Sequence, residues 1–296
     1  MRVGLQLPLY TWPGAPASIG PRLDEIAQAA EAAGFHSLWV MDHFFQLPPG
    51  TGLGGPDAPM LEAYTTLGFL ARATRRIRLG PMVAGGHFRP PAVLLKAATT
   101  LDVVSGGRTY FAVGAGWYER ESVGLGIPFP PRRERFERLE DVLRLAHHVW
   151  SDGPPRPFSG RHVEAAEPIW NPRPVERPRP PIMVGGSGER KTLRLVARYA
   201  DACNILVPDP GESRAKLDVL KRHCDDLGRD DAEIEKTSLV ETDLRSGADA
   251  ARRVVAQLRA QADEGIEHVI VNLPDVEVPD RIATFGREII PEVAPL

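Results

Sequence analysis

The sequence has few cysteines, since Cys203 and Cys224 are the only two among 296 residues. They lie far apart with no second pair beside them, which excludes a disulfide framework and a zinc ribbon. No stretch approaches the roughly 18–20 apolar residues that a membrane span requires. The first residues lead directly into a strand pattern and lack the apolar segment of a signal peptide. We therefore expect free thiols and a cytoplasmic protein.

Neither sign of charge dominates the chain. The 36 lysines and arginines nearly balance the 39 aspartates and glutamates, which leaves a formal net charge of −3. Such a balance creates no strong field toward nucleic acid or a membrane surface, so we expect neither as a partner. With 43% hydrophobic and 25% charged residues, the composition is that of an ordinary globular protein with a large core.

What the sequence does contain is a regular alternation of short apolar runs with longer segments of helical periodicity. This alternation is typical of repeated strand–helix units around a parallel sheet. Eight such units predict a single α/β domain over residues 1–296, a (β/α)8 TIM barrel. The expected strands cover residues 3–7, 37–41, 77–84, 110–113, 182–184, 202–206, 235–240 and 268–272, and the expected helices cover residues 24–33, 62–74, 91–104, 133–150, 189–199, 212–227, 248–264 and 279–293.

One long segment, residues 153–181, interrupts the alternation between the fourth and fifth expected strands. It is rich in proline and carries only two weak extended stretches, one near His162 and one near Ile169, which indicate a small hairpin. We expect an insertion that passes over the barrel rather than a linker between domains. Together with the loop at residues 44–59, it is expected to shape the substrate pocket.

Two ionisable side chains follow the second expected strand. The apolar strand residues end at Met41, and Asp42 and His43 come where the mouth of a barrel opens. A histidine beside a carboxylate can act as a general acid or base near neutral pH, or can hydrogen-bond a redox cofactor. The alternative is a solvated pair in a loop. We name His43 as the catalytic candidate and Asp42 as its support.

Glycine-rich segments follow the third and fourth expected strands. Residues 80–86 place glycines at both ends of an apolar step, which indicates either a bulge beside a flat ligand or a plain strand followed by a glycine turn. Residues 113–119 begin like a dinucleotide fingerprint, but Glu119 stands at the third glycine position. The fingerprint therefore fails, and the segment is interpreted as a side-chain-poor loop beside a planar ring.

A third glycine-rich segment, residues 184–191, runs from the fifth expected strand into a helix. Free backbone N–H groups at a helix start, with Arg190 or Lys191 close by, form an anion site, and a phosphate is our hypothesis. The alternative is a glycine-rich turn in which Ser187 caps the helix. Both interpretations can hold together.

Other catalytic patterns are missing from the sequence. Metal-dependent hydrolase barrels need two histidines at the end of the first strand, where Gln6, Leu7 and Pro8 stand. Neither a His-Glu-x-x-His metal motif nor a Gly-x-Ser-x-Gly nucleophile elbow occurs. We therefore expect no metal site, and these absences argue against a hydrolase.

Taken in order, the motifs resemble the luciferase-like monooxygenase superfamily, and specifically its branch of oxidoreductases that depend on the deazaflavin coenzyme F420. The resemblance covers nearly the whole chain. Its most specific stretches lie at residues 38–43, 78–80, 89–91, 100–108, 114–117, 124–131, 135–136, 185–189 and 198–201.

The resemblance implies a homodimeric barrel that binds F420 or FMN at the C-terminal ends of its strands. It implies that Asp42 and His43 lie next to the redox-active face of the ring. A bulge of the third strand, often with a cis peptide against the ring, would fall on Met82 and Val83. The implied cofactor-binding residues are Met82, Val83, Ala84, Gly114, Ala115, Gly116, Trp117, Gly185, Gly186, Ser187 and Gly188.

The function that the resemblance implies is hydride transfer between C5 of the deazaflavin and a small organic substrate. His43 would donate or accept the accompanying proton, or orient the substrate. The cofactor supplies the hydride transfer, and the protein positions the reactants and sets the electrostatics around them. Members that oxidise sugar phosphates carry a glutamate where Trp117 stands, so we expect another substrate, with Trp117 as an apolar wall of its pocket.

Two other functions fit the same residues. The first is an FMN-dependent monooxygenase of a two-component system, because FMN and F420 share the shape of the ring and a phosphate. The second is a non-catalytic deazaflavin-binding protein, since the sequence offers few acid–base residues besides His43.

Overall fold

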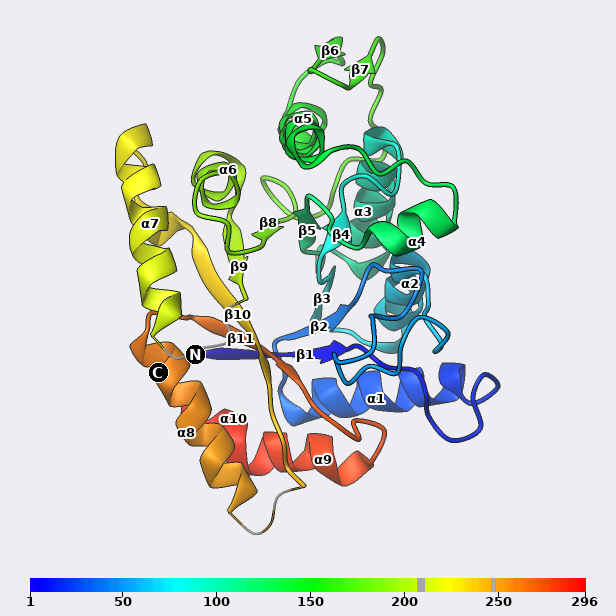
Figure 1. The fold of residues 1–296 in the computed structure, drawn as a ribbon, viewed down its shortest axis with the longest axis vertical. Helices are drawn as coiled ribbons and strands as arrows, with labels where there is room; N and C mark the ends of the chain where they lie inside the picture. The colour runs from blue at the N-terminus through cyan, green and yellow to red at the C-terminus, as the bar shows by residue number, and fades with distance from the viewer. Residues whose placement is uncertain (207–210, 246, 248) are drawn as a thin grey trace.

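One parallel sheet organises the chain. The computed structural model describes residues 1–206, 211–245, 247 and 249–296. Within them, parallel strands follow one another around the sheet in the order β3-β2-β1-β11-β10-β9-β8-β5-β4 (Figure 1). The strands are β1 (Arg2–Leu7), β2 (Ser37–Val40), β3 (Arg78–Pro81), β4 (Ala84–Gly85), β5 (Phe111–Gly114), β8 (Ile182–Gly185), β9 (Ala202–Ile205), β10 (Glu235–Glu241) and β11 (His268–Asn272).

The sheet closes on itself through β3 and β4, which are two parts of one barrel strand. β3 pairs with β2, whereas β4 pairs with β5. A parallel bridge from Leu79 to Thr109 joins β3 to the residues just before β5. Counting β3 and β4 as one strand gives the eight positions of a (β/α)8 barrel, so the expected fold class is confirmed.

Helices cover the outside of the barrel (Figure 1). Gly34 and Gly106 end α1 and α3 in the left-handed conformation that favours glycine at a helix C-terminus. Residue 248, the expected start of one helix, lies outside the described residues, and no described helix has the length and apolar character that crossing a membrane requires. The helices are α1 (Ile19–Ala33), α2 (Ala63–Ala73), α3 (Pro91–Ser105), α4 (Glu119–Gly124), α5 (Arg132–Trp150), α6 (Thr192–Tyr199), α7 (Glu212–Leu227), α8 (Ala250–Asp263), α9 (Pro279–Thr284) and α10 (Ile290–Val293).

Proline accounts for two differences between the expected and observed helices. The first helix begins at Ile19 rather than at residue 24, because Pro21 is tolerated in the first turn of a helix. The last expected helix, residues 279–293, is divided into α9, a π-helical turn (Phe285–Ile289) and α10. Pro291 cannot donate the backbone hydrogen bond that an uninterrupted α-helix requires at that position.

The chain between β5 and β8 contains the expected insertion. It does contain a small hairpin, in which β6 (Phe158–Ser159) and β7 (Glu164–Ala165) pair antiparallel, but the expected extended stretch near Ile169 forms no strand. Both strands lie beyond α5, on the side of this helix away from the barrel sheet (Figure 1). The hairpin therefore extends the molecule outward.

Hydrogen bonds hold the rest of the insertion against α3. Trp170 Nε1 donates to Thr99 Oγ1 at 3.0 Å, and the backbone N–H of Val175 donates to the buried Asp102 at 2.6 Å. The expectation that residues 153–181 pass over the barrel is therefore wrong. The acceptors for the Trp170 indole and the Val175 backbone N–H belong to α3, so the segment packs against this helix.

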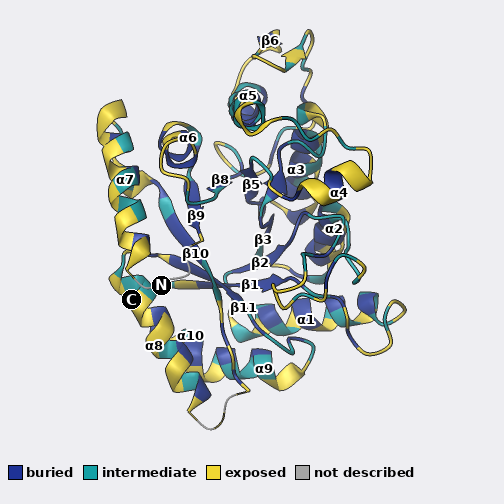
Figure 2. Ribbon diagram, viewed as in Figure 1, coloured by how far each residue is buried: buried dark blue, intermediate teal, exposed yellow. Residues whose placement is uncertain are grey.

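The barrel strands consist largely of buried residues, and most exposed residues lie on the surrounding helices and loops (Figure 2). The centre of the barrel is filled by large apolar side chains, among them Trp39. Toward the N-terminal ends of the strands, Trp39 Nε1 donates to Ser37 Oγ at 2.7 Å, and Ser37 lies 2.8 Å from His268 Nε2. His268 Nδ1 in turn lies 2.8 Å from Glu235. This satisfied polar chain closes the N-terminal end, which leaves the C-terminal end for a ligand.

Candidate active site

A cavity of about 460 Å³ opens at the C-terminal ends of the strands. Its walls come from the residues that follow β2, β5, β8 and β9, and its floor comes from the residues between β3 and β4. All of the residues predicted for the site border this cavity. They are Asp42, His43, Met82, Val83, Ala84, Gly114, Ala115, Gly116, Trp117, Gly185, Gly186, Ser187 and Gly188.

Two larger hollows lie elsewhere on the described surface. One of about 950 Å³ surrounds Arg2 and His36 at the N-terminal ends of the strands. Another of about 750 Å³ lies beside the ends of β1, β10 and β11. We place the chemistry in the smaller cavity because polar and glycine-rich groups from several strand ends converge there, as they do in barrel enzymes.

The cavity floor is the bulge between β3 and β4. The peptide bond between Met82 and Val83 is cis, at the position that the family resemblance implied. An ideal Cβ on Gly114 would lie 3.0 Å from a Val83 methyl group, and one on Gly185 would lie 2.8 Å from the other. Gly114 and Gly185 therefore leave space for the side chain of Val83. The family resemblance implied that these glycines lie close to the ligand.

We predict that Gly185→Ala destabilises the protein through Val83. The added methyl group overpacks the floor, at a cost of roughly 1–3 kcal/mol in the free energy of unfolding. In the double variant Val83→Ala/Gly185→Ala the clashing methyl groups are gone, so the two costs are expected to be non-additive. Urea unfolding measures each free energy. The control is Gly20→Ala, whose new Cβ would meet no atom within 4 Å apart from its chain neighbours and the backbone of its own helix. Simple additivity would contradict this account.

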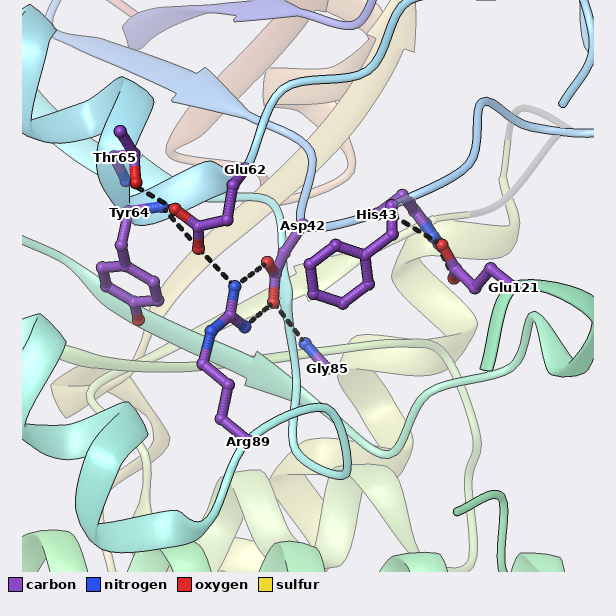
Figure 3. A network of polar contacts seen from close by, with 9 residues as sticks. Asp42, His43, Glu62, Tyr64, Thr65, Gly85, Arg89 and Glu121 are labelled. Carbon is purple, nitrogen blue, oxygen red and sulfur yellow. Dashed lines mark hydrogen bonds and ion pairs between the residues drawn. The ribbon is translucent and has the colours of Figure 1, made fainter. Parts of the chain in front are cut away.

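Asp42 is held by an arginine and a backbone amide (Figure 3). Arg89 donates to both carboxylate oxygens at 2.7 and 2.8 Å, and the N–H of Gly85 donates at 3.0 Å. Arg89 also contacts Glu62, whose carboxylate caps the N-terminus of α2. Burial opposes the charge of Arg89, but the hydrogen bonds and charges of Asp42 and Glu62 outweigh it and raise the pKa above its usual value. Asp42 thus ties the end of β2 to β4.

His43 has a different partner, which comes from α4. Its Nδ1 atom lies 2.6 Å from Oε1 of Glu121, a fully buried side chain. The rings of His43 and Trp117 pack edge to face, with centroids 5.9 Å apart. The His43 side chain is 15% exposed, and it borders the cavity. The adjacent residues Asp42 and His43 therefore serve separate networks, as the alternation of directions along an extended chain leads one to expect.

The glycine-rich loop after β8 uses its serine within the protein. Ser187 Oγ donates to the backbone oxygen of Leu206 at 2.7 Å and accepts from the Leu206 N–H at 3.0 Å. The interpretation of Ser187 as a helix cap is therefore wrong. α6 begins at Thr192 rather than at residue 189, and no side chain caps it. The cation of Lys191 lies 5.1 Å from the ring centre of Phe136, a wall residue of the cavity.

Two arginines at the start of α5 also line the cavity. Arg135 stacks over the ring of Phe129 at 3.9 Å and donates to the backbone oxygen of Pro130 at 2.7 Å. Burial is the main cause that lowers its pKa from the usual value. Arg132 forms the exposed part of the same wall. The cavity rim is therefore cationic.

Sequence reasoning missed several residues that organise the site, above all Glu121, His87 and Arg89. His87 lies 3.0 Å from Ser122 Oγ, and burial lowers its pKa to about 4, which keeps the ring neutral. Arg89 carried a signal, because it begins the Arg-Pro-Pro stretch of the family resemblance. Glu121 and His87 carried none, since their partners are distant in the sequence.

The fold and this cavity define a class: an enzyme built on a (β/α)8 barrel, with its site at the C-terminal ends of the strands. The chain belongs to the luciferase-like monooxygenase family, whose family model matches residues 1–287. The family expected from the sequence is confirmed.

Several known proteins are similar to this chain. An uncharacterized protein of Mycobacterium tuberculosis is 30% identical over 273 residues, which cover 88% of this chain and 90% of that protein. An F420-dependent glucose-6-phosphate dehydrogenase of Amycolatopsis mediterranei is 34% identical over 183 residues, or 61% of this chain and 51% of that protein. Among solved structures, an F420-dependent secondary alcohol dehydrogenase in complex with an F420-acetone adduct matches with a TM-score of 0.81 at 20% identity, over 99% of this chain and 98% of that one.

Proposed function

We propose that this protein is an F420-dependent oxidoreductase that transfers hydride between the deazaflavin and a small organic substrate. Relatives and structural neighbours named as F420-dependent enzymes support the choice of cofactor. They include the coenzyme F420-dependent tetrahydromethanopterin reductase of Methanopyrus kandleri, with a TM-score of 0.79 at 17% identity.

The observation that carries the proposal is one cavity with an apolar floor and a cationic rim. Met82 and Val83 line the cavity with an apolar surface that would suit a flat ring, and Arg132 and Arg135 line it with positive charge that would hold an anionic tail. Among the described residues of the lining, Asp42 is the one carboxylate, and Arg89 neutralises it. These residues fit a deazaflavin with a phosphate-bearing tail.

His43 is the proton-transfer residue of this proposal. F420, when bound, supplies hydride transfer at C5 of its ring. His43 Nε2 takes the proton that a substrate hydroxyl releases during oxidation, or returns it to the carbonyl oxygen during reduction. Asp42 supports the floor through Gly85 and Arg89 and does not touch the substrate in this proposal.

The wall beside His43 suits an apolar substrate rather than a sugar phosphate. Trp117 is 59% exposed at the cavity and stacks on Tyr118, with ring centroids 5.2 Å apart. The Trp117 indole offers a phosphorylated sugar no carboxylate to accept a hydrogen bond from a sugar hydroxyl. We therefore propose an alcohol, ketone, enone or imine with an apolar group that packs on Trp117.

A cofactor titration tests the proposal. The purified protein is titrated with F420 and with FMN, and turnover is then assayed with a panel of secondary alcohols, ketones, enones and imines. We expect tighter binding of F420 and turnover with an apolar member of the panel. Tighter binding of FMN with substrate-dependent oxygen consumption would favour the two-component monooxygenase, and F420 binding without any turnover would favour a non-catalytic binding protein. The homodimer and the cytoplasmic location stay predictions.

A further inference from the structure

Glu121 joins two loops of the barrel mouth through one buried carboxylate. Its Oε2 atom accepts the backbone N–H of Phe44 at 2.8 Å and that of Phe45 at 3.3 Å, and its Oε1 atom lies 2.6 Å from His43 Nδ1 (Figure 3). Glu121 belongs to α4, after β5, whereas its partners follow β2. The side chain is fully buried, so water does not compete for these contacts.

The hydrogen-bond partners of Glu121 determine which nitrogen of His43 carries the hydrogen. An ionised carboxylate accepts at both oxygens, and here it faces three donor positions. The two backbone amides donate to Oε2, so Oε1 is the acceptor for the ring. In the neutral imidazole, Nδ1 therefore carries the hydrogen, and Nε2 keeps its lone pair. No described residue hydrogen-bonds Nε2, and the ring borders the cavity.

We propose that Glu121 is a positioning residue that fixes His43 in the Nδ1–H tautomer and directs the Nε2 lone pair at the substrate. This inference rests on the proposed role of His43 in proton transfer. A ring held in this tautomer can take a hydroxyl proton at Nε2, and the resulting imidazolium remains bound to the carboxylate. The arrangement resembles the support that a buried carboxylate gives the histidine of a catalytic triad.

The variant Glu121→Gln separates this role from simple packing. The glutamine amide has one acceptor oxygen and one donor nitrogen. The two backbone N–H groups of Phe44 and Phe45 require the oxygen, which leaves the amide nitrogen facing His43 Nδ1. Nδ1 must then accept, and the hydrogen moves to Nε2. The substitution is therefore expected to invert the tautomer while it preserves the shape of the side chain.

The ¹⁵N chemical shifts of the histidine rings report the tautomer directly, and no cofactor is needed. The His43 signals are identified by their absence in His43→Asn. We expect the Nδ1–H form in the native protein and the Nε2–H form in Glu121→Gln, with turnover lowered by roughly 10²–10⁴-fold and F420 affinity retained. The matched control is Glu137→Gln, whose carboxylate lies 2.9 Å from His162 on the outside of α5. It should leave turnover and the His43 signals unchanged.

Two results would overturn the proposal. An Nε2–H tautomer of His43 in the native protein would do so even if the variant failed to fold. An unchanged Nδ1–H tautomer in folded Glu121→Gln would do so as well. If the tautomer inverts but neither protein turns over any substrate, the positioning by Glu121 stands and the proposed oxidoreductase function fails.

Discussion

Replacing His43 with alanine is expected to lower turnover by roughly 10²–10⁴-fold, the contribution of a well-placed general acid or base. The affinity for F420 should change little, because the floor and the cationic rim of the cavity do not include His43. Steady-state kinetics with a substrate from the panel measures the first quantity, and quenching of F420 fluorescence measures the second.

The matched control for this substitution is His162→Ala. His162 also pairs with a glutamate, Glu137, but it lies on the insertion and does not border the cavity. Loss of its imidazole should leave turnover unchanged. If His43→Ala kept the native turnover, His43 would have no part in the mechanism.

The second large effect is expected for Arg89→Met, which leaves the Asp42 carboxylate buried without its counter-ion. The side chains of Arg89 and Asp42 are 13% and 1% exposed. Removal of one partner from a buried ion pair costs about 3–5 kcal/mol in the free energy of unfolding. Urea unfolding measures this loss. Because Arg89 also fixes the start of β4 through Asp42, weaker F420 binding should accompany it.

Arg144→Met is the control for Arg89→Met. Arg144 also pairs with a buried aspartate, Asp141, but it is 41% exposed and the two side chains are 3.4 Å apart. Its loss should cost about 0–1 kcal/mol. The double variant Asp42→Asn/Arg89→Met removes the unpaired charge and should recover part of the stability. Equal losses in Arg89→Met and Arg144→Met would contradict the importance of the buried pair.

The strands and the place of the catalytic candidates were predictable because both depend on local sequence. An apolar run that ends at Met41 predicts a strand end, and the barrel places Asp42 and His43 at its mouth. The separate hydrogen-bond partners of these two side chains were not predictable. The partners are Arg89 and Glu121, which reach Asp42 and His43 only through the closure of the barrel.

The helix α4 is another feature that the local sequence did not predict. Its six residues are too few for a recognisable helical period, and two of them, Glu121 and Ser122, are buried polar side chains. Such residues look like surface residues in a sequence, because an unpaired carboxylate is almost never fully buried. Glu121 is buried here because His43 and two backbone amides satisfy it.

The insertion was placed wrongly for a related reason. Its prolines indicate an irregular segment, and residues 153–181 were expected to pass over the barrel and to shape the substrate pocket. The segment packs against α3 instead, because Thr99 accepts a hydrogen bond from the Trp170 indole and Asp102 accepts one from the Val175 backbone N–H.

The insertion is separate from the lining of the active-site cavity. Among the described residues that line the 460 Å³ cavity, none comes from residues 153–181. The hairpin β6–β7 reaches this lining through α5, where the backbone N–H of His162 donates to Asp141. Surface loops tolerate insertions and sequence changes. New contacts can therefore arise on the hairpin without replacing a residue of the cavity lining.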